Sequence, residues 1–379
     1  MAKKAYIGVD NVARRIRKGY IGVDGVARRI RKAYIGIGGV ARPCMSGELE
    51  YYGTIEDYPI AANGMGATTV GDYAVFAGGR MYRNGGSSST VVLGYDKSLV
   101  TTLPAGLTVG RNGMGATTVG DYAVFAGGYG NEQASQKTVD AYDKSLIRQQ
   151  LSSLSSNRYD LGATSVGNYA LFAGGASTTA DAPTKSVEAY SYDLTKFTGS
   201  ISDLDYAKYG LCATTIGNYA LFLGGWTPGS NETYSEAYNS SLTKSSVNIK
   251  ADNSYGAATT VGDYAIYGGG RNYNNAVHKA VYAINRSLTV TQMTDLSRAR
   301  AHLAATAVGE YAIFAGGYYG SGYYKHVDVY DKSLTHTQFT SLSVGRCSLA
   351  ATTTGFYAVF VGGLESYQSP VATVDVYTA

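Results

Sequence analysis

A repeated stretch constrains the fold of this sequence more than any other feature. The letters NGMGATTVGDYAVFAGG occupy residues 63–79 and recur without a change at residues 112–128. Five looser copies follow, and their last glycines are Gly175, Gly225, Gly270, Gly317 and Gly363. The seven copies are spaced by roughly fifty residues, a period typical of repeats that each form one sheet. The chain is therefore expected to build seven similar units in series.

Each long repeat can be divided into four strands. GATTV is rich in small residues, as expected for a strand crowded around a central axis, and Gly-Asp or Gly-Asn then gives a tight hairpin turn. The apolar strand YAVFA follows, and its closing Gly-Gly permits backbone conformations that other residues avoid. A variable loop leads to a third strand such as HVDVYD, and a KSL turn leads to a fourth. The pattern predicts an all-β protein, a seven-bladed β-propeller.

Residues 48–379 resemble the kelch family of β-propellers. The resemblance rests on the repeated Gly-Gly and on a tyrosine near the end of the third strand. These tyrosines are Tyr95, Tyr142, Tyr190, Tyr238, Tyr282, Tyr330 and Tyr377. Kelch repeats usually carry a tryptophan in the fourth strand, whereas the single tryptophan here, Trp226, lies in a loop. We expect leucine or phenylalanine to replace it, at Leu103, Leu154, Leu204 and Phe339.

The two ends of the repeat array predict a closed ring. The seventh repeat stops at VDVYTA, after its third strand, and GELEYYGTIEDYP at residues 47–59 has no other place in the pattern. This N-terminal segment is expected to pair as the fourth strand of the seventh blade. Such pairing leaves no open sheet edge.

Residues 1–45 differ from the rest and are expected to form a separate basic arm, with the propeller occupying residues 46–379. They carry eleven Lys or Arg and two Asp, a net charge of +9, so the overall charge of +4 leaves −5 for the remainder. Tyr6, Tyr20 and Tyr34 mark a fourteen-residue repeat. The returning Asp-Gly favours short β-hairpins, and a helix over VARRIRKAYI is the alternative.

The arm is similar to YIGVDGVAR-type repeats of proteins encoded by bacteriophages and prophages. This similarity implies a virion protein, assembled in the bacterial host cytoplasm as a tail or decoration protein, whose arm docks onto other virion proteins. The arm residues expected to dock are Tyr6, Arg14, Arg15, Tyr20, Arg28, Arg29 and Tyr34. Clustered Arg and Lys also attract phosphate, but we rank nucleic acid below a protein partner.

The loops after the second strands differ from blade to blade, whereas the turns at the opposite ends of the strands are nearly constant. Binding usually resides in loops carried by a rigid scaffold. These loops combine aromatic residues with Ser, Gly and Asn, a mixture typical of binding surfaces. The residues expected to bind a host-surface or environmental glycan or protein are Tyr82, Arg83, Tyr129, Trp226, Arg271, Tyr273, Tyr318, Tyr319, Tyr323, Tyr324 and Tyr367. The alternative is that these residues simply lie in solvated loops and bind nothing.

The sequence favours a binding protein over an enzyme and calls for no cofactor or metal. His278, His302, His326 and His336 lie in different repeats without metal-ligand spacing. Cys212 replaces the small residues of sibling repeats, which favours a core position, and three cysteines cannot form a disulfide framework. No apolar run is long enough for a signal peptide or a membrane span. An intracellular kelch-type adaptor with a basic arm for nucleic acid or a partner remains the alternative to a virion adhesin.

Overall fold

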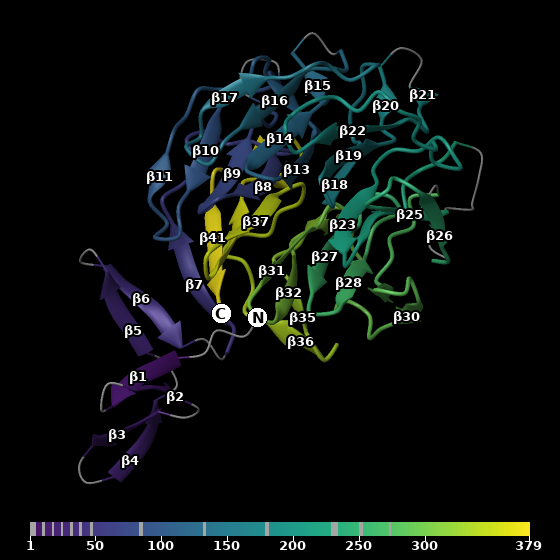
Figure 1. The fold of residues 1–379 in the computed structure, drawn as a ribbon. Coiled ribbons are helices and arrows are strands. Elements are labelled where there is room, and N and C mark those ends of the chain that lie inside the picture. The colour runs from purple at the N-terminus through teal and green to yellow at the C-terminus, as the bar shows by residue number, and fades with distance from the viewer. Residues whose placement is uncertain are drawn as a thin grey trace.

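The chain forms a seven-bladed β-propeller, as the repeats predict. The computed structural model describes residues 48–82, 86–131, 134–178, 182–228, 234–249, 253–272 and 274–379, together with the backbone of six strands between residues 5 and 45. Within this part, seven antiparallel sheets stand around one axis like the blades of a fan (Figure 1). The innermost strands of successive blades contact one another around the axis in sequence order.

The blades are numbered in chain order, and their strands are given from the axis outward. Blades one to four consist of β8 (Gly66–Val70), β9 (Tyr73–Ala77), β10 (Val92–Tyr95) and β11 (Thr101–Thr102); β13 (Gly115–Val119), β14 (Tyr122–Ala126), β16 (Val139–Tyr142) and β17 (Arg148–Gln150); β18 (Gly162–Val166), β19 (Tyr169–Ala173) and β22 (Val187–Ser191); and β23 (Cys212–Ile216), β24 (Tyr219–Leu223), β25 (Ser235–Asn239) and β26 (Lys244–Val247). Blades five to seven consist of β27 (Ala257–Val261), β28 (Tyr264–Gly268), β29 (Val281–Asn285) and β30 (Val290–Gln292); β31 (Ala304–Val308), β32 (Tyr311–Ala315), β35 (Val327–Asp331) and β36 (His336–Phe339); and β37 (Ala350–Thr354), β38 (Tyr357–Val361), β41 (Val374–Thr378) and β7 (Glu50–Ile55).

The predicted ring closure is confirmed. Strand β7 pairs antiparallel with β41 and becomes the outer strand of blade seven, although more than 300 residues separate the two strands in sequence (Figure 1). The Tyr51 hydroxyl donates a hydrogen bond of 2.5 Å to the Asp375 carboxylate across this pair. The last blade is thus completed by the first propeller strand, which covers the outer edge of β41.

The constant Gly-Gly is required by both conformation and space. Gly78 and Gly79 have φ angles of +71° and +104°, in the region that favours glycine. A Cβ atom on Gly79 would lie 2.6 Å from Cγ of Met65. All six sibling pairs also have positive φ at both glycines. The pair therefore turns the chain from the second strand into the loop while packing against the preceding connection.

Tyrosines at the end of the third strand join neighbouring blades. The Tyr142 ring packs edge-on against Phe125, with 6.0 Å between the ring centroids, and its hydroxyl donates to the Ala105 carbonyl in the connection from blade one. Tyr190, Tyr238, Tyr330 and Tyr377 make the corresponding bonds. The assignment of Tyr282 to this set was wrong. It pairs with Tyr267, two residue pairs further along the ladder, and Ile284 takes the tyrosine position in blade five.

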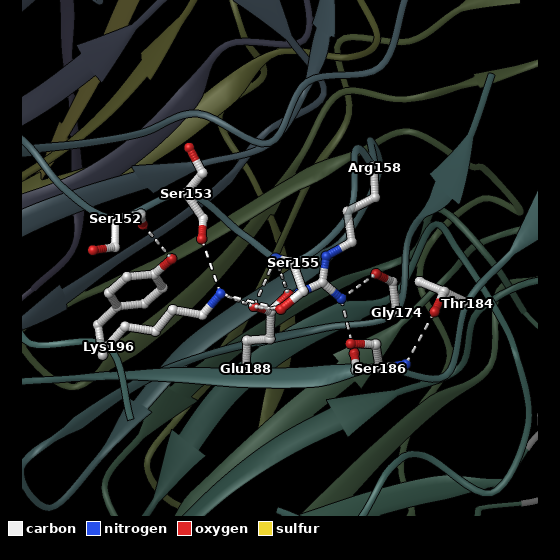
Figure 2. Close-up of polar contacts among 10 residues, drawn as sticks. Ser152, Ser153, Ser155, Arg158, Gly174, Thr184, Ser186, Glu188 and Lys196 are labelled. Atoms are coloured by element: carbon white, nitrogen blue, oxygen red, sulfur yellow. Dashed lines mark hydrogen bonds and ion pairs between the residues drawn. The ribbon is translucent and has the colours of Figure 1, made fainter. Parts of the chain in front are cut away.

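A buried ion pair fixes the base of the loop in five blades. In blade three, the Arg158 guanidinium donates to Glu188 at 2.7 Å and to the carbonyls of Gly174 and Ser186, so one side chain holds the Gly-Gly, the loop end and strand β22 together (Figure 2). Lys196 approaches the other Glu188 oxygen at 2.6 Å. The equivalent pairs are Arg111–Asp140, Lys208–Glu236, Arg300–Asp328 and Arg346–Asp375.

Blades one and five have lost both members of this pair together. Ala62 and Leu93 stand at the two positions in blade one, and Asn253 and Tyr282 stand there in blade five. An isolated buried charge is costly, which explains why neither partner survives alone. This pairing is absent from the sequence-based predictions because its two members lie about thirty residues apart.

The apolar residues expected near the fourth strands were only partly predicted. Leu154 and Leu204 are buried, but Leu103 is 65% exposed and Phe339 is half-buried. The buried side chain that recurs lies four residues before the ion-pair cation, at Leu107, Leu154, Leu204, Leu296 and Leu342. Leu103 was wrong: the buried leucine of blade one is Leu107, which follows Tyr95 at the same spacing as Leu154 follows Tyr142.

The N-terminal arm is built of strands, as the sequence favours. It consists of three antiparallel hairpins formed by β1 (Ala5–Val9) with β2 (Val12–Ile16), β3 (Gly19–Val23) with β4 (Val26–Ile30), and β5 (Ala33–Ile37) with β6 (Val40–Met45), drawn purple in Figure 1. Tyr6 pairs with Arg15, and Tyr20 pairs with Arg29 one repeat later. The side chains of this arm lie outside the described residues.

Candidate binding face

The two ends of the blades form two faces of different character. The turn face carries the turns between first and second strands and between third and fourth strands. On it, exposed side chains close repeated ion pairs: Lys97–Asp72, Lys144–Asp121, Arg286–Asp263 and Lys332–Glu310. The loop face carries the loops between second and third strands and the connections between blades. Because adjacent strands run antiparallel, these segments all emerge on the opposite side from the turns.

A repeated backbone bridge sets the start of each loop. The residue after the Gly-Gly pairs with the residue that lies three positions before the first strand of its own blade. The bridged pairs are Asn63–Arg80, Asn112–Tyr129, Tyr159–Ala176, Tyr209–Trp226, Ser254–Arg271, Ala301–Tyr318 and Cys347–Leu364. Main-chain atoms make the bridge, so the side chain can change from blade to blade without loss of the scaffold.

A second backbone feature encircles the axis next to these bridges. The residue at the following position of each blade donates its N–H to the carbonyl of the equivalent residue in the preceding blade, over 2.7–2.9 Å. Gly64 donates to Ser348, which closes the circle. The seven residues of this hydrogen-bonded ring are Gly64, Gly113, Asp160, Gly210, Tyr255, His302 and Ser348. We call the space inside it the axial mouth.

The axial mouth is a cavity of about 360 Å³ lined by every blade. This volume is at the lower end of the range for small-molecule sites. The ring residues and their neighbours Asn63 and Asn112 provide its polar lining, and Met114, Leu161, Leu211, Leu303 and Leu349 provide apolar atoms. A larger hollow of about 510 Å³ lies on the turn face, where the Asp72–Lys97 ion pair forms part of its lining.

Side chains from distant blades meet across the mouth. The Tyr255 hydroxyl donates to Asp160 Oδ2 at 2.9 Å, so blades three and five are joined over blade four. The His302 ring stacks on Tyr255 with 4.1 Å between centroids, and its Nδ1 lies 3.4 Å from the Ser348 hydroxyl. Arg271 lies over the Tyr255 ring at 5.1 Å.

The surroundings of the mouth shift the pKa values of Asp160 and His302 so that the uncharged form of each side chain is favoured. Burial raises the pKa of Asp160 to about 6, with partial compensation from the Tyr255 hydrogen bond and from Arg271. Burial, and then the nearby Arg271 charge, lowers the pKa of His302 to about 3. The imidazole is therefore neutral at physiological pH and offers one donor and one acceptor.

Aromatic rings continue from the mouth around the loop face. Starting in blade two, each ring contacts the next with centroids between 4.1 and 6.3 Å apart. We call this path the aromatic arc; its members are Tyr129, Tyr159, Tyr209, Tyr255, His302, Tyr318 and Tyr323. Trp226 joins at Tyr209, 5.1 Å away. The arc spans blades two to six.

The predicted binding residues fall into three groups. Tyr129, Trp226, Arg271 and Tyr318 stand at the bridged positions around the mouth, and Tyr323 lies beside Tyr318. Tyr319 and Tyr367 are 55% and 83% exposed. Tyr324 packs beneath Arg298, and Tyr82 packs beneath Arg80. Arg83 and Tyr273 lie outside the described residues, as do the side chains of the docking residues of the arm. The face thus gathers most of the predicted set, but its two outer tyrosines stand apart from the arc.

The sequence-based prediction missed the residues of the mouth itself: Asp160, Tyr255, His302 and Ser348, together with Tyr159 and Tyr209 of the arc. The signal was present in the repeats. Three copies have glycine at the ring position, and four have a different side chain within an otherwise constant stretch. This position is informative because it varies within a stretch that is otherwise shared by the repeats.

Two further expectations concern chemistry. Cys212 is buried in the core, where burial raises the pKa of its thiol to about 12, which fits a packing residue. Among the residues that the structure describes, no three His, Cys, Asp or Glu side chains gather as a metal site would require, and no helix is long and apolar enough to span a membrane.

No model of a known protein family matches the chain, and no curated protein is significantly similar to it.

Proposed function

We propose that this protein is an adhesin or decoration protein of a bacteriophage virion that binds glycans through the loop face. The observation that carries the binding proposal is the aromatic arc, because it lies on the face whose loops differ and borders the polar cavity at the axis. A β-propeller fits a protein that acts by interaction, since it presents variable loops on a rigid frame.

The chemistry of the face favours carbohydrate. Sugars present C–H faces that pack on aromatic rings and hydroxyls that need both donors and acceptors. Tyr209, Trp226 and Tyr318 supply rings at the rim. Asp160, Ser348 and the neutral His302 supply donors and acceptors a few ångströms away. Weak sites of this kind become effective when many copies act together, as they do on a particle.

The virion assignment is supported by the arm. Its repeats are similar to those of phage-encoded proteins, and its hairpins recur with the same strand register, Tyr6 opposite Arg15 and Tyr20 opposite Arg29. A repeated basic strip fits docking along an assembly of other virion proteins. An intracellular adaptor, with the arm on a partner or on nucleic acid, is the second candidate, and the propeller fold suits it equally well.

Binding is tested with two matched sets of substitutions on the full chain. The loop-face variant carries Tyr318, Tyr319, Tyr323 and Tyr324 replaced by Ser, and the turn-face variant carries Lys97→Ser and Lys144→Ser. On a glycan array and on whole host cells, we expect the loop-face variant to lose binding and the turn-face variant to retain it. Full binding by the loop-face variant would refute the assignment of the face. Mass spectrometry of purified particles tests the location, because an intracellular adaptor would be absent from them.

A further inference from the structure

We propose that the axial mouth is a distinct subsite for one uncharged sugar ring with adjacent hydroxyls, held by Asp160, His302 and Ser348 and oriented by Tyr255. This proposal rests on the glycan-binding function proposed above and goes beyond it by naming the subsite, its residues and the chemical class of its ligand. None of the four residues was among the loop residues expected to bind.

The backbone conformation indicates that these side chains are not needed to form the hydrogen-bonded ring. Asp160, Tyr255, His302 and Ser348 have φ angles of +51°, +55°, +54° and +52°. Residues other than glycine avoid this region, and bulky ones most of all. Gly64, Gly113 and Gly210 make the same ring hydrogen bonds at the equivalent positions without strain. Strain of this kind persists where the side chain serves a purpose that the backbone does not.

The glycines of the ring make room for the side chains of their neighbours. A Cβ atom on Gly113 would lie 2.6 Å from the Asp160 carboxylate, and one on Gly210 would lie 3.1 Å from the Tyr255 ring. The side chains of blades three and five therefore lean over the glycines of blades two and four. The seven-fold repeat thus becomes an asymmetric cavity, in which Asp160 and Tyr255 crowd the positions of Gly113 and Gly210, whereas Gly64 has neighbours only at 3.7 Å and beyond.

The polar groups match a sugar hydroxyl pattern. A carboxylate accepts hydrogen bonds on two oxygens, and Tyr255 occupies Asp160 Oδ2 while holding the group in place. The neutral His302 and the Ser348 hydroxyl can each donate or accept. Asn63 Oδ1, also at the mouth, is buried without a hydrogen-bond partner in the described structure, and a ligand hydroxyl would satisfy it.

The charge of the mouth selects against acidic sugars. Asp160 is the one carboxylate of its lining. The nearest cation, Arg271, lies over Tyr255 and donates to the Tyr318 hydroxyl at 3.2 Å, so it is engaged at the rim. A uronic or sialic acid would bring a second carboxylate next to Asp160. We therefore expect neutral hexoses and N-acetylhexosamines to be preferred.

The test uses substitutions that restore the glycine of the sibling repeats. The mouth variant carries Asp160→Gly, Tyr255→Gly and His302→Gly in the full chain, and Asp160→Asn is its conservative counterpart. Saturation-transfer NMR with a panel of free neutral hexoses and N-acetylhexosamines, and with glucuronic and sialic acids, measures binding by the wild-type protein. Thermal melting establishes that each variant is folded.

We expect at least one neutral sugar to bind the wild-type protein and to bind the mouth variant and Asp160→Asn at least tenfold more weakly, while the turn-face variant still binds the free sugar as the wild-type protein does. The proposal is overturned if no neutral sugar binds, if a folded Asp160→Asn binds as tightly as wild type, or if the acids are preferred. Binding of a free amine in place of sugars would also overturn it. If the loop-face variant loses cell binding while the mouth variant binds as the wild-type protein does, the proposed function stands and only the subsite is refuted.

Discussion

The loop face and the turn face are built on the same strands, yet one varies and the other repeats. On the turn face, side chains such as Lys97 and Asp72 complete the structure by pairing with one another. On the loop face, backbone bridges and the hydrogen-bonded ring complete the structure, and buried ion pairs hold it from below. The side chains at the bridged and ring positions are therefore not required to close the fold. A repeat protein gains a variable surface where its main chain, rather than its side chains, closes the fold.

The largest expected effect on stability comes from deleting a strand of the propeller that supports both faces. Removal of residues 1–57 deletes β7 and exposes the edge of β41, whereas removal of residues 1–45 leaves the propeller whole. The longer deletion should abolish cooperative unfolding or lower the melting temperature by far more than the shorter one. Thermal melts monitored by circular dichroism measure this, and equal melting temperatures would show that β7 does not close the ring.

The ion pairs under the loop face should contribute far more than those on the turn face. Arg111→Ala leaves the Asp140 carboxylate buried alone and should cost about 3–5 kcal/mol of unfolding free energy. Lys332→Ala breaks the exposed pair with Glu310 and should cost less than about 1 kcal/mol. Urea unfolding compares the two. The double variant Arg111→Ala with Asp140→Leu copies Ala62 and Leu93 of blade one and should recover part of the loss; a double variant worse than Arg111→Ala would contradict this explanation.

The glycines of the loop face separate close packing from backbone strain. Gly79→Ala combines a φ angle of +104° with a contact of 2.6 Å to Met65, and strain plus overpacking should cost about 2–5 kcal/mol. Gly320→Ala meets only the strain, since no atom lies within 4 Å of its Cβ position, and should cost about 1 kcal/mol. Chemical denaturation gives both values, and equal costs would mean that the Gly-Gly is retained for conformation alone.

The mouth should have opposing effects of pH on stability. The raised pKa of Asp160, about 6, means that its carboxyl stabilises the fold while protonated, and this contribution is lost as pH rises from about 4 to about 6. The lowered pKa of His302, about 3, means that its neutral ring stabilises the fold above about pH 6.5, and this contribution is lost on acidification. Between about pH 4 and 6 the two slopes should largely cancel.

Single substitutions uncover each slope. Asp160→Asn should leave a protein whose unfolding free energy falls on acidification by up to about 1.4 kcal/mol per pH unit, and His302→Gln should reverse the sign. Urea unfolding between pH 4 and 7 measures the difference from wild type. Two variants with the same pH dependence would show that Asp160 and His302 do not titrate as their surroundings indicate.

The difference between the faces also explains what the sequence could predict. Seven copies of Gly-Gly and of the Gly-Asp or Gly-Asn turn define the strands, so the propeller and its closure by residues 47–59 followed from spacing alone. Tyr282 was misplaced because blade five has Ile284 at the tyrosine position and a tyrosine two residues before it. Leu103 was misplaced because two leucines lie four residues apart in this connection and only Leu107 is buried. The mouth depends on contacts such as Tyr255 with Asp160, which lie 95 residues apart and meet only once the ring is closed. The sequence could indicate that the ring position varies, but not which side chains meet there.

The most direct test of the loop face compares tyrosines of similar exposure on different parts of the molecule. Tyr319 and Tyr367 are 55% and 83% exposed on the loop face, and Tyr52 and Tyr192, on the outer strand of blade seven and on the turn face, are 54% and 57% exposed. Nitration by a small diffusible reagent, read by mass spectrometry, is measured with the protein free and bound to host cells or to a glycan found on the array. We predict that binding protects Tyr319 and Tyr367 and leaves Tyr52 and Tyr192 unchanged. Protection of Tyr192 with continued nitration of Tyr319 and Tyr367 would contradict the account and assign binding to the turn face.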